Sequence, residues 1–75
     1  MILYRDSTKN FCKEALHNRV AHAMSDVFET HFGYPPHRSE FQAWMNSSQH
    51  IKNLIEISGL KDNMICLEYE VPYNT

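Results

Sequence analysis

The longest apolar pattern in the chain runs from residue 11 to residue 32. Apolar side chains recur there every three or four positions, which is the spacing of one helix face held for about six turns. The preceding segment DSTK (residues 6–9) offers three cap residues, and Gly33 is placed to end the helix in a left-handed conformation. The pattern predicts one long helix. Its apolar positions are Phe11, Cys12, Ala15, Leu16, Val20, Ala23, Met24, Val27, Phe28 and Phe32.

A second helix is predicted after the two prolines of the segment YPPH. Ser39 is followed three residues later by Gln42, which is the spacing of a capping box, and Glu40 suits the positive end of the helix dipole. Gly59 supplies the stop, and the link of about six residues brings this helix back antiparallel to the first. The expected buried stripe consists of Phe41, Trp44, Met45, Ser48, Ile51, Leu54, Ile55 and Ser58.

Two strands are predicted at the two ends of the sequence, in MILYR (residues 1–5) and MICLEYEV (residues 64–71). In the second segment, apolar and polar residues alternate, so one face is buried and the other carries Glu68 and Glu70. The expected buried row is Ile65, Leu67, Tyr69 and Val71. The predicted fold is α+β in the order strand, helix, helix, strand, with two long antiparallel helices packed on a small antiparallel two-stranded sheet.

Length and composition narrow the class of protein. A chain of 75 residues forms a single small domain (1–75), which buries only about 60% of its unfolded surface. Apolar residues make up 43% and charged residues 21%, and no apolar run approaches the roughly 20 residues of a membrane span. The segment MILYRDS (residues 1–7) lacks the basic start, the long apolar middle and the cleavage site of a secretory signal. We therefore expect a soluble cytoplasmic protein, with no membrane association and with both cysteines reduced.

The residues that most often carry chemistry do not form a recognisable site. His17 and His22 are five positions apart, whereas a zinc pair on one helix face needs a spacing of four. Cys12 has no base at a catalytic spacing, and Cys66 lies beside Glu68 on the strand, where a carboxylate disfavours a thiolate. We expect no catalytic residue, no metal site and no cofactor, and therefore a protein that is not an enzyme.

Scattered segments along almost the whole chain resemble one known family. The segments MILY, SEFQAWMNS, IKNLIE, LKDN and LEYEVPYNT, taken in order, are similar to the N-terminal nuclease-like region of the Schlafen-related DNA/RNA helicase-like proteins, which combine a nuclease-type domain with an ATPase. The resemblance implies a truncation before the catalytic strands, because the Arg-Ile-Asp-like and Glu-x-Lys-like segments of that family are absent. Of the family's metal-site groups, only Glu40 has a counterpart here, and one carboxylate cannot hold Mg²⁺.

The leading interpretation is a non-catalytic interaction protein that binds a protein partner. A two-stranded sheet leaves two strand edges with unpaired backbone groups, and such edges attract further strands. Because proteins of this nuclease-ATPase type resemble components of defence and mobile-element systems, the resemblance implies an inhibitor or regulator of a defence or nucleic-acid-processing partner. The candidate binding residues are Glu68, Tyr69, Glu70 and Tyr73. The alternatives are that the tyrosines close the end of a small core and that the glutamates face solvent opposite Arg5.

The charges of the first predicted helix suggest a homodimer. Lys9 and Lys13 occupy its first turns and Asp26 and Glu29 its last turns, which is the reverse of the order that the helix dipole favours. An antiparallel second copy would bring each basic end to an acidic end. Self-association through this helix or through a strand edge is therefore expected, although solvated charges placed by chance explain the same order.

A second functional class remains open. The chain is in this case the front part of a restriction-endonuclease-like nuclease domain, which contacts nucleic acid through Arg19, Arg38, Lys52 and Lys61. The net charge of −2 makes such binding weak, because few phosphates are neutralised. The sequence does not decide whether the chain is a complete gene product or a fragment.

Overall fold

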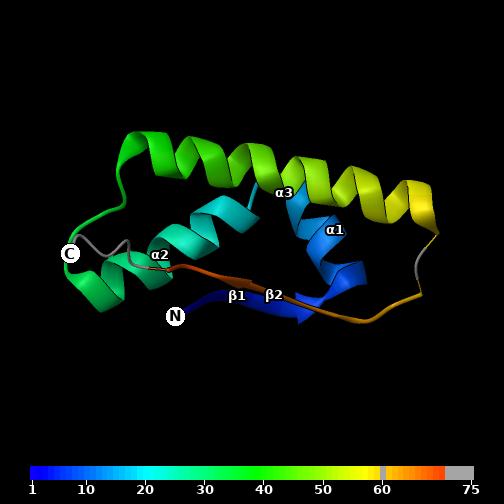
Figure 1. Ribbon diagram of the computed structural model, residues 1–75, viewed down its shortest axis with the longest axis horizontal. Coiled ribbons are helices and arrows are strands. Elements are labelled where there is room, and N and C mark those ends of the chain that lie inside the picture. Colours follow the sequence, from blue (N-terminus) through cyan, green and yellow to red (C-terminus); the bar gives the residue numbers. More distant parts are fainter. Residues whose placement is uncertain (60, 71–75) are drawn as a thin grey trace.

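The chain folds into three stacked layers (Figure 1). A computed structural model describes residues 1–59 and 61–70. Its elements are β1 (Ile2–Ser7), α1 (Thr8–Leu16), α2 (Val20–Phe32), α3 (Arg38–Ser58) and β2 (Met64–Glu68). The two antiparallel strands form one layer, α1 and α2 form the middle layer, and α3 covers the helices on the side away from the strands. The predicted α+β class and the antiparallel two-stranded sheet are confirmed.

The long first helix of the prediction is in fact two helices. Asn18 adopts a left-handed conformation with a φ of 57°. The N–H of Arg19 donates to the carbonyl of Glu14 with an N···O distance of 2.9 Å, and the N–H of Asn18 donates to the carbonyl of Ala15 at 3.0 Å. This pair of bonds around a left-handed residue ends an α-helix. The chain therefore turns between α1 and α2, and the middle layer consists of two short helices.

The helix ends agree with the sequence at some positions and differ at others. Ser7 caps α1, because its hydroxyl accepts a hydrogen bond from the N–H of Asn10 at 3.1 Å. Gly33 and Gly59 end α2 and α3 with φ values of 81° and 65°, as predicted.

The start of α3 differs from the predicted capping box. The cap is His37, whose ring Nδ1 accepts a hydrogen bond from the N–H of Ser39 at 3.2 Å. The Gln42 side chain donates to the Asn46 side chain, one turn further along the helix, instead of reaching back. The helix therefore begins at Arg38, because the imidazole performs the role that the sequence assigned to the serine hydroxyl.

The buried core lies in the middle layer, because α1 and α2 are covered on both sides. By contrast, the two buried residues of α3 are polar, namely Ser48 and Lys52. The Lys52 ammonium lies 3.2 Å from a carboxylate oxygen of Glu56, so the buried charge is paired. The buried apolar residues are Leu3, Phe11, Ala15, Val20, Ala21, Met24 and Phe28.

Four residues of the predicted buried stripes are exposed, among them Ser58 at the end of α3. Leu16, 64% exposed, is the last residue of α1, directly before the turn. Val27 is 40% exposed, because the break at Asn18 changes the direction of the face that α2 buries. Leu54 is 53% exposed, because α3 packs on the helical layer along one narrow face and does not contact the strands within the described residues.

The first strand contains a bulge that the sequence did not predict. Ile2 pairs with Glu68 and Tyr4 pairs with Leu67, so β1 has one extra residue, Leu3, at this point. Leu3 is buried and Tyr4 is half-buried, whereas Ile2 and Arg5 on either side of them are exposed. The bulge therefore keeps two consecutive large side chains on the inner face of the sheet.

The second strand alternates as predicted. Ile65, Leu67 and Tyr69 are half-buried, whereas Cys66 and Glu68 face solvent. Val71, the last residue of the predicted inner row, lies outside the described residues. Among the residues that the structure describes, no helix is long and apolar enough to span a membrane.

Candidate interaction surface

The hydrogen bonds at the two ends of the strand pair define which backbone groups of β2 face outward. At one end, the N-terminal ammonium of Met1 donates to the carbonyl of Tyr69 at 3.1 Å, and the N–H of Tyr69 donates to the carbonyl of Met1 at 2.8 Å. At the other end, the N–H of Thr8 donates to the carbonyl of Asn63 at 2.7 Å. Because residues of an antiparallel strand alternate between facing their partner and facing away, the odd-numbered residues of β2 bond to β1.

The even-numbered residues of β2 therefore present their backbone groups at the outer edge of the sheet. By this alternation, the backbone groups of Cys66 and Glu68 point away from β1, and outside the strand ladder they form no hydrogen bond to another described residue. The N–H of Met64 is the exception, because it donates to the Asn63 side-chain oxygen at 2.8 Å. The outer edge of β2 thus offers two consecutive donor and acceptor pairs, at the spacing that an added strand requires.

The outer edge of β1 is less open. The bulge at Leu3 interrupts the regular spacing of its backbone groups, and the N–H of Ser7 donates to the Asp6 carboxylate at 2.7 Å. The backbone of α2 lies close to that of β1 and not to that of β2. Bulges and covering helices are two of the ways in which proteins protect strand edges. Of the two edges, that of β2 is the better candidate for binding.

The exposed face of the sheet mixes apolar and acidic side chains. Met64 (61% exposed), Cys66 and Glu68 form the outward row of β2, and Glu70 follows it at an exposed position. Arg5 lies directly across from Cys66 in the register, diagonal to Glu68. The structure therefore brings the predicted residues Glu68 and Glu70 to the open edge. Cys66 lies in the same row, as the alternation predicted, although it was not among the predicted binding residues.

The structure places Tyr69 in an aromatic cluster at one end of the core. Its ring centroid lies 5.3 Å from that of Phe28, 6.1 Å from that of Phe32 and 6.2 Å from that of Trp44. A hydrogen bond to Glu40, with a smaller effect of burial, raises the pKa of Tyr69 above its ordinary value. These contacts match the alternative in which the tyrosine closes the core. The predicted binding residue Tyr73 lies outside the described residues.

The four charged residues that suggested a bipolar helix lie on two different helices. The expectation of one bipolar helix is therefore wrong, because the turn at Asn18 separates the basic pair from the acidic pair. Lys13 belongs to the last turn of α1, where the helix dipole favours a cation. The residues concerned, all of them exposed, are Lys9, Lys13, Asp26 and Glu29.

The basic residues considered for nucleic acid are not brought together. Lys52 is only 9% exposed and is paired with Glu56. Arg38 begins α3 and Lys61 follows its C-terminal end, and the 21 residues of the helix span about 31 Å. Arg19 lies in the turn before α2, at 3.9 Å from the Glu14 carboxylate. The structure therefore shows no common basic patch formed by these residues.

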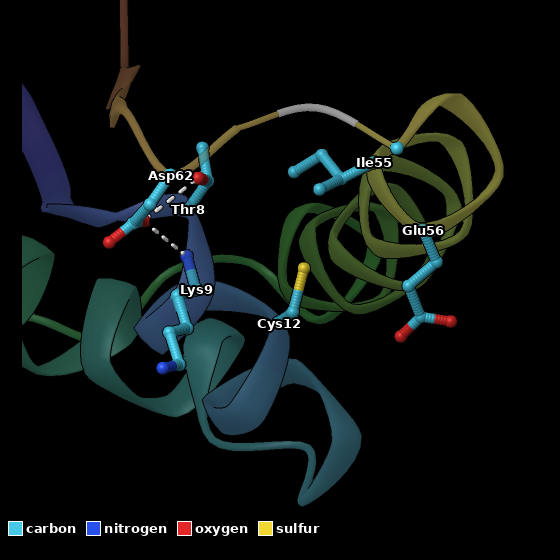
Figure 2. A pocket seen from close by; sticks show the side chains of 7 residues that line it. Thr8, Lys9, Cys12, Ile55, Glu56 and Asp62 are labelled. Atoms are coloured by element: carbon cyan, nitrogen blue, oxygen red, sulfur yellow. Dashed lines mark hydrogen bonds between the residues drawn. The ribbon is translucent and has the colours of Figure 1, made fainter.

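A hollow of about 340 Å³ lies between the start of α1 and the end of α3 (Figure 2). Cys12 and Ile55 point into it, and Asp62 lines its rim. The Asp62 carboxylate accepts hydrogen bonds from the Thr8 hydroxyl at 3.1 Å and from the Lys9 N–H at 3.0 Å. Burial raises the pKa of the Cys12 thiol, which disfavours the reactive thiolate. The polar groups of the hollow thus hold the start of α1 to the segment before β2.

The histidines of the chain have separate structural positions. His22 packs edge-on against Phe41, with 5.1 Å between ring centroids, and His37 caps α3. His17 lies in the turn that ends α1. Within residues 1–59 and 61–70, no three His, Cys, Asp or Glu side chains lie together in a way that could hold a metal ion.

Comparison with known proteins found no matching family model, no matching curated protein and no matching solved structure. The interpretation of the surface therefore depends on its geometry.

Proposed function

We propose that this chain is a non-catalytic interaction protein, which takes an extended segment of a protein partner onto the outer edge of β2. The observation that carries the proposal is the strand register, which turns the backbone groups of Cys66 and Glu68 away from β1. From Met64 to Glu68 the strand contains no proline, and the register irregularity of the sheet lies in β1. Recognition by strand addition uses such main-chain groups for affinity and the alternating side chains for specificity.

The side chains of β2 define the chemistry of a suitable partner segment. An added strand would place one row of side chains beside Ile65 and Leu67, which are half-buried at the edge of the core. Its other row would lie beside Glu68 and Glu70 on the exposed face. Opposite charges on adjacent strands attract, and apolar neighbours exclude water. The partner segment therefore alternates apolar residues with lysine or arginine.

The proposed biological role is regulation or inhibition of a nucleic-acid-processing partner. This part rests on the resemblance of the sequence to the nuclease-like region of Schlafen-related proteins, which are similar to components of defence and mobile-element systems. Both cysteines are free thiols, which fits a reducing cytoplasmic setting. In this role the chain acts by occupying a surface of the partner.

A quantitative pull-down with three baits tests the proposal. The baits are the wild type, Glu68→Pro and Arg5→Pro, each checked for its fold by circular dichroism. Both prolines remove an N–H that points away from the β1–β2 ladder, so neither breaks the ladder. Mass spectrometry of the proteins captured from the host extract should identify one that binds to the wild-type and Arg5→Pro baits and does not bind to the Glu68→Pro bait. Capture that is equal for all three baits would overturn the proposal.

A further inference from the structure

We infer that a second copy of this chain also fits the outer edge of β2, so that two β2 strands pair antiparallel about a two-fold axis at Cys66. The inference rests on the open edge described under the proposed function and names one occupant of it. The product is a four-stranded sheet with the order β1, β2, β2 of the second copy, β1 of the second copy. A two-fold axis makes such an interface self-complementary, with the same surface used by both copies.

The hydrogen-bond pattern permits only some alignments of the two strands. Residues whose backbone groups face outward must lie opposite each other, and on β2 these are the even-numbered residues. With the axis at Cys66, this residue faces Cys66 of the second copy, and Glu68 faces Met64 of the second copy. Every residue from Met64 to Glu68 then lies opposite a residue of the second copy, and the N–H of Met64 exchanges its bond to the Asn63 side chain for one to Glu68.

The charges favour this alignment over its neighbours. A shift that moves the axis to Glu68 places two glutamates directly opposite each other, which is destabilising. With the axis at Leu67, the two Glu68 side chains are diagonal neighbours. With the axis at Cys66, they are separated by the length of the strand, and each faces a methionine. Extension of this pairing would oppose Glu70 to Asp62 of the second copy, so we expect the pairing to end with the strand.

The position of the helices leaves space for the second copy. The backbone of α2 lies close to that of β1 and not to that of β2, and α1 approaches both strands near the point where Thr8 bonds to Asn63. The α2 part of the middle layer is therefore centred over β1. An axis perpendicular to the sheet keeps both helical layers on the same side, each over its own β1. The new seam between the two β2 strands then lies where the helical cover is thinnest.

The energetic gain comes from converting a two-stranded ribbon into a four-stranded sheet. Two-stranded ribbons are marginal, and three or more strands with a covered face are much more stable. The contact consists of only five residues per copy, which places it among the small and weak interfaces. Association should therefore depend on concentration and is best detected by trapping the dimer covalently.

Cysteine cross-linking tests the pairing directly. In the Cys12→Ser background, Cys66 is the sole thiol, and its two copies should lie about 5.5 Å apart between Cα atoms. A short bis-maleimide should trap a covalent dimer in native buffer. Adding Glu68→Pro should reduce the yield several-fold, whereas adding Arg5→Pro should leave it unchanged. The baseline for random collision is a Cys12→Ser, Cys66→Ser, Ser47→Cys protein, whose sole thiol is on the exposed side of α3.

The outcomes separate this inference from the proposed function. A Cys66 yield equal to the Ser47→Cys baseline, or a yield that Glu68→Pro does not reduce, would overturn the dimer. If a host protein is still lost from the Glu68→Pro bait in that case, strand addition to a partner stands without self-association. If the dimer is trapped as expected and no host protein responds to Glu68→Pro, the dimer stands and the proposed partner function fails.

Discussion

The two strands share one ladder, but different forces hold them in the molecule. Strand β1 is anchored by Leu3, which is 3% exposed and belongs to the core cluster, and α2 packs against it. Strand β2 has no fully buried residue. It is held by its ladder bonds, by the bonds at its two ends, from Met1 to Tyr69 and from Thr8 to Asn63, and by the partial burial of Ile65 and Leu67 against the core.

This difference explains why a partner is proposed for β2. Strand β1 packs its side chains into the core, and the bulge that goes with this packing interrupts the hydrogen-bonding groups of its outer edge. Strand β2 keeps a regular backbone, so its outward N–H and C=O groups stay at the spacing that hydrogen bonding to another strand requires. The strand that contributes least to the core is therefore the better binding strand.

The largest effect should come from prolines placed on the two sides of β2. Leu67→Pro removes a bond of the ladder and a half-buried side chain, which together cost about 4 kcal/mol. Glu68→Pro removes only an outward N–H and should cost less than about 1 kcal/mol. Urea unfolding followed by circular dichroism compares the two variants. Equal destabilisation would show that the assignment of inner and outer backbone groups is wrong.

Leucine-to-alanine substitutions should reveal the unequal anchoring of the strands. Leu3→Ala creates a cavity in the core and should lower the free energy of unfolding by about 3 kcal/mol. Leu67→Ala truncates a side chain that is only half-buried and should lower it by about 1 kcal/mol. The same urea titration gives both values. A larger loss for Leu67→Ala than for Leu3→Ala would reverse the comparison.

The polar connection at the start of β2 should have an intermediate effect. The Thr8 hydroxyl donates to Asp62 at 3.1 Å and accepts from the N–H of Asn63 at 2.9 Å. Thr8→Val keeps the shape and removes both bonds, which should cost about 1 to 2 kcal/mol. Thr8→Ser keeps the hydroxyl and serves as the control. If valine and serine destabilise equally, the hydroxyl does not hold β2 in place.

The smallest effect should be a pH dependence that comes from β1. The side-chain hydrogen bond from Asn10, and then the backbone N–H of Ser7, lower the pKa of Asp6 below its ordinary 3.8. Because the folded pKa is depressed, the bonds of Asp6 stabilise the fold above pH 3.8, and this contribution is lost as the pH falls through the lowered pKa.

The control for this pH dependence is Asp6→Asn, which does not titrate at this position. The difference in urea midpoint between the wild type and Asp6→Asn should shrink as the pH is lowered through this range. A difference that stays constant with pH would contradict the assigned bonds of Asp6.

Sequence patterns predicted the parts of the fold that depend on local chemistry. The alternation of β2 predicted its inner and outer rows, because its partner strand does not disturb its spacing. The two glycines predicted the ends of α2 and α3. The residue that ends a helix often adopts a left-handed conformation, and glycine adopts that conformation most easily. The exposed position of Glu68 and Glu70 followed from the same alternation.

The remaining features depend on contacts between distant residues. Asn18 ends α1 in a left-handed conformation, which asparagine can adopt but does not require. The apolar spacing on both sides of it therefore predicted one helix. The bulge at Leu3 is created by packing against the core, which no alternation within MILYR indicates. Likewise, Lys52 is buried only because α3 covers the middle layer.

The central claim is that the outer edge of β2 is open and binds an added strand. Residue-resolved amide hydrogen exchange by NMR tests it most directly. In dilute protein, the amides of Ile65 and Leu67 should be protected, whereas those of Cys66 and Glu68 should exchange rapidly. At high concentration or with a captured partner, Cys66 and Glu68 should become protected while Arg5 does not. Protection of Cys66 and Glu68 in dilute protein, or binding that leaves both amides unprotected, would contradict the claim.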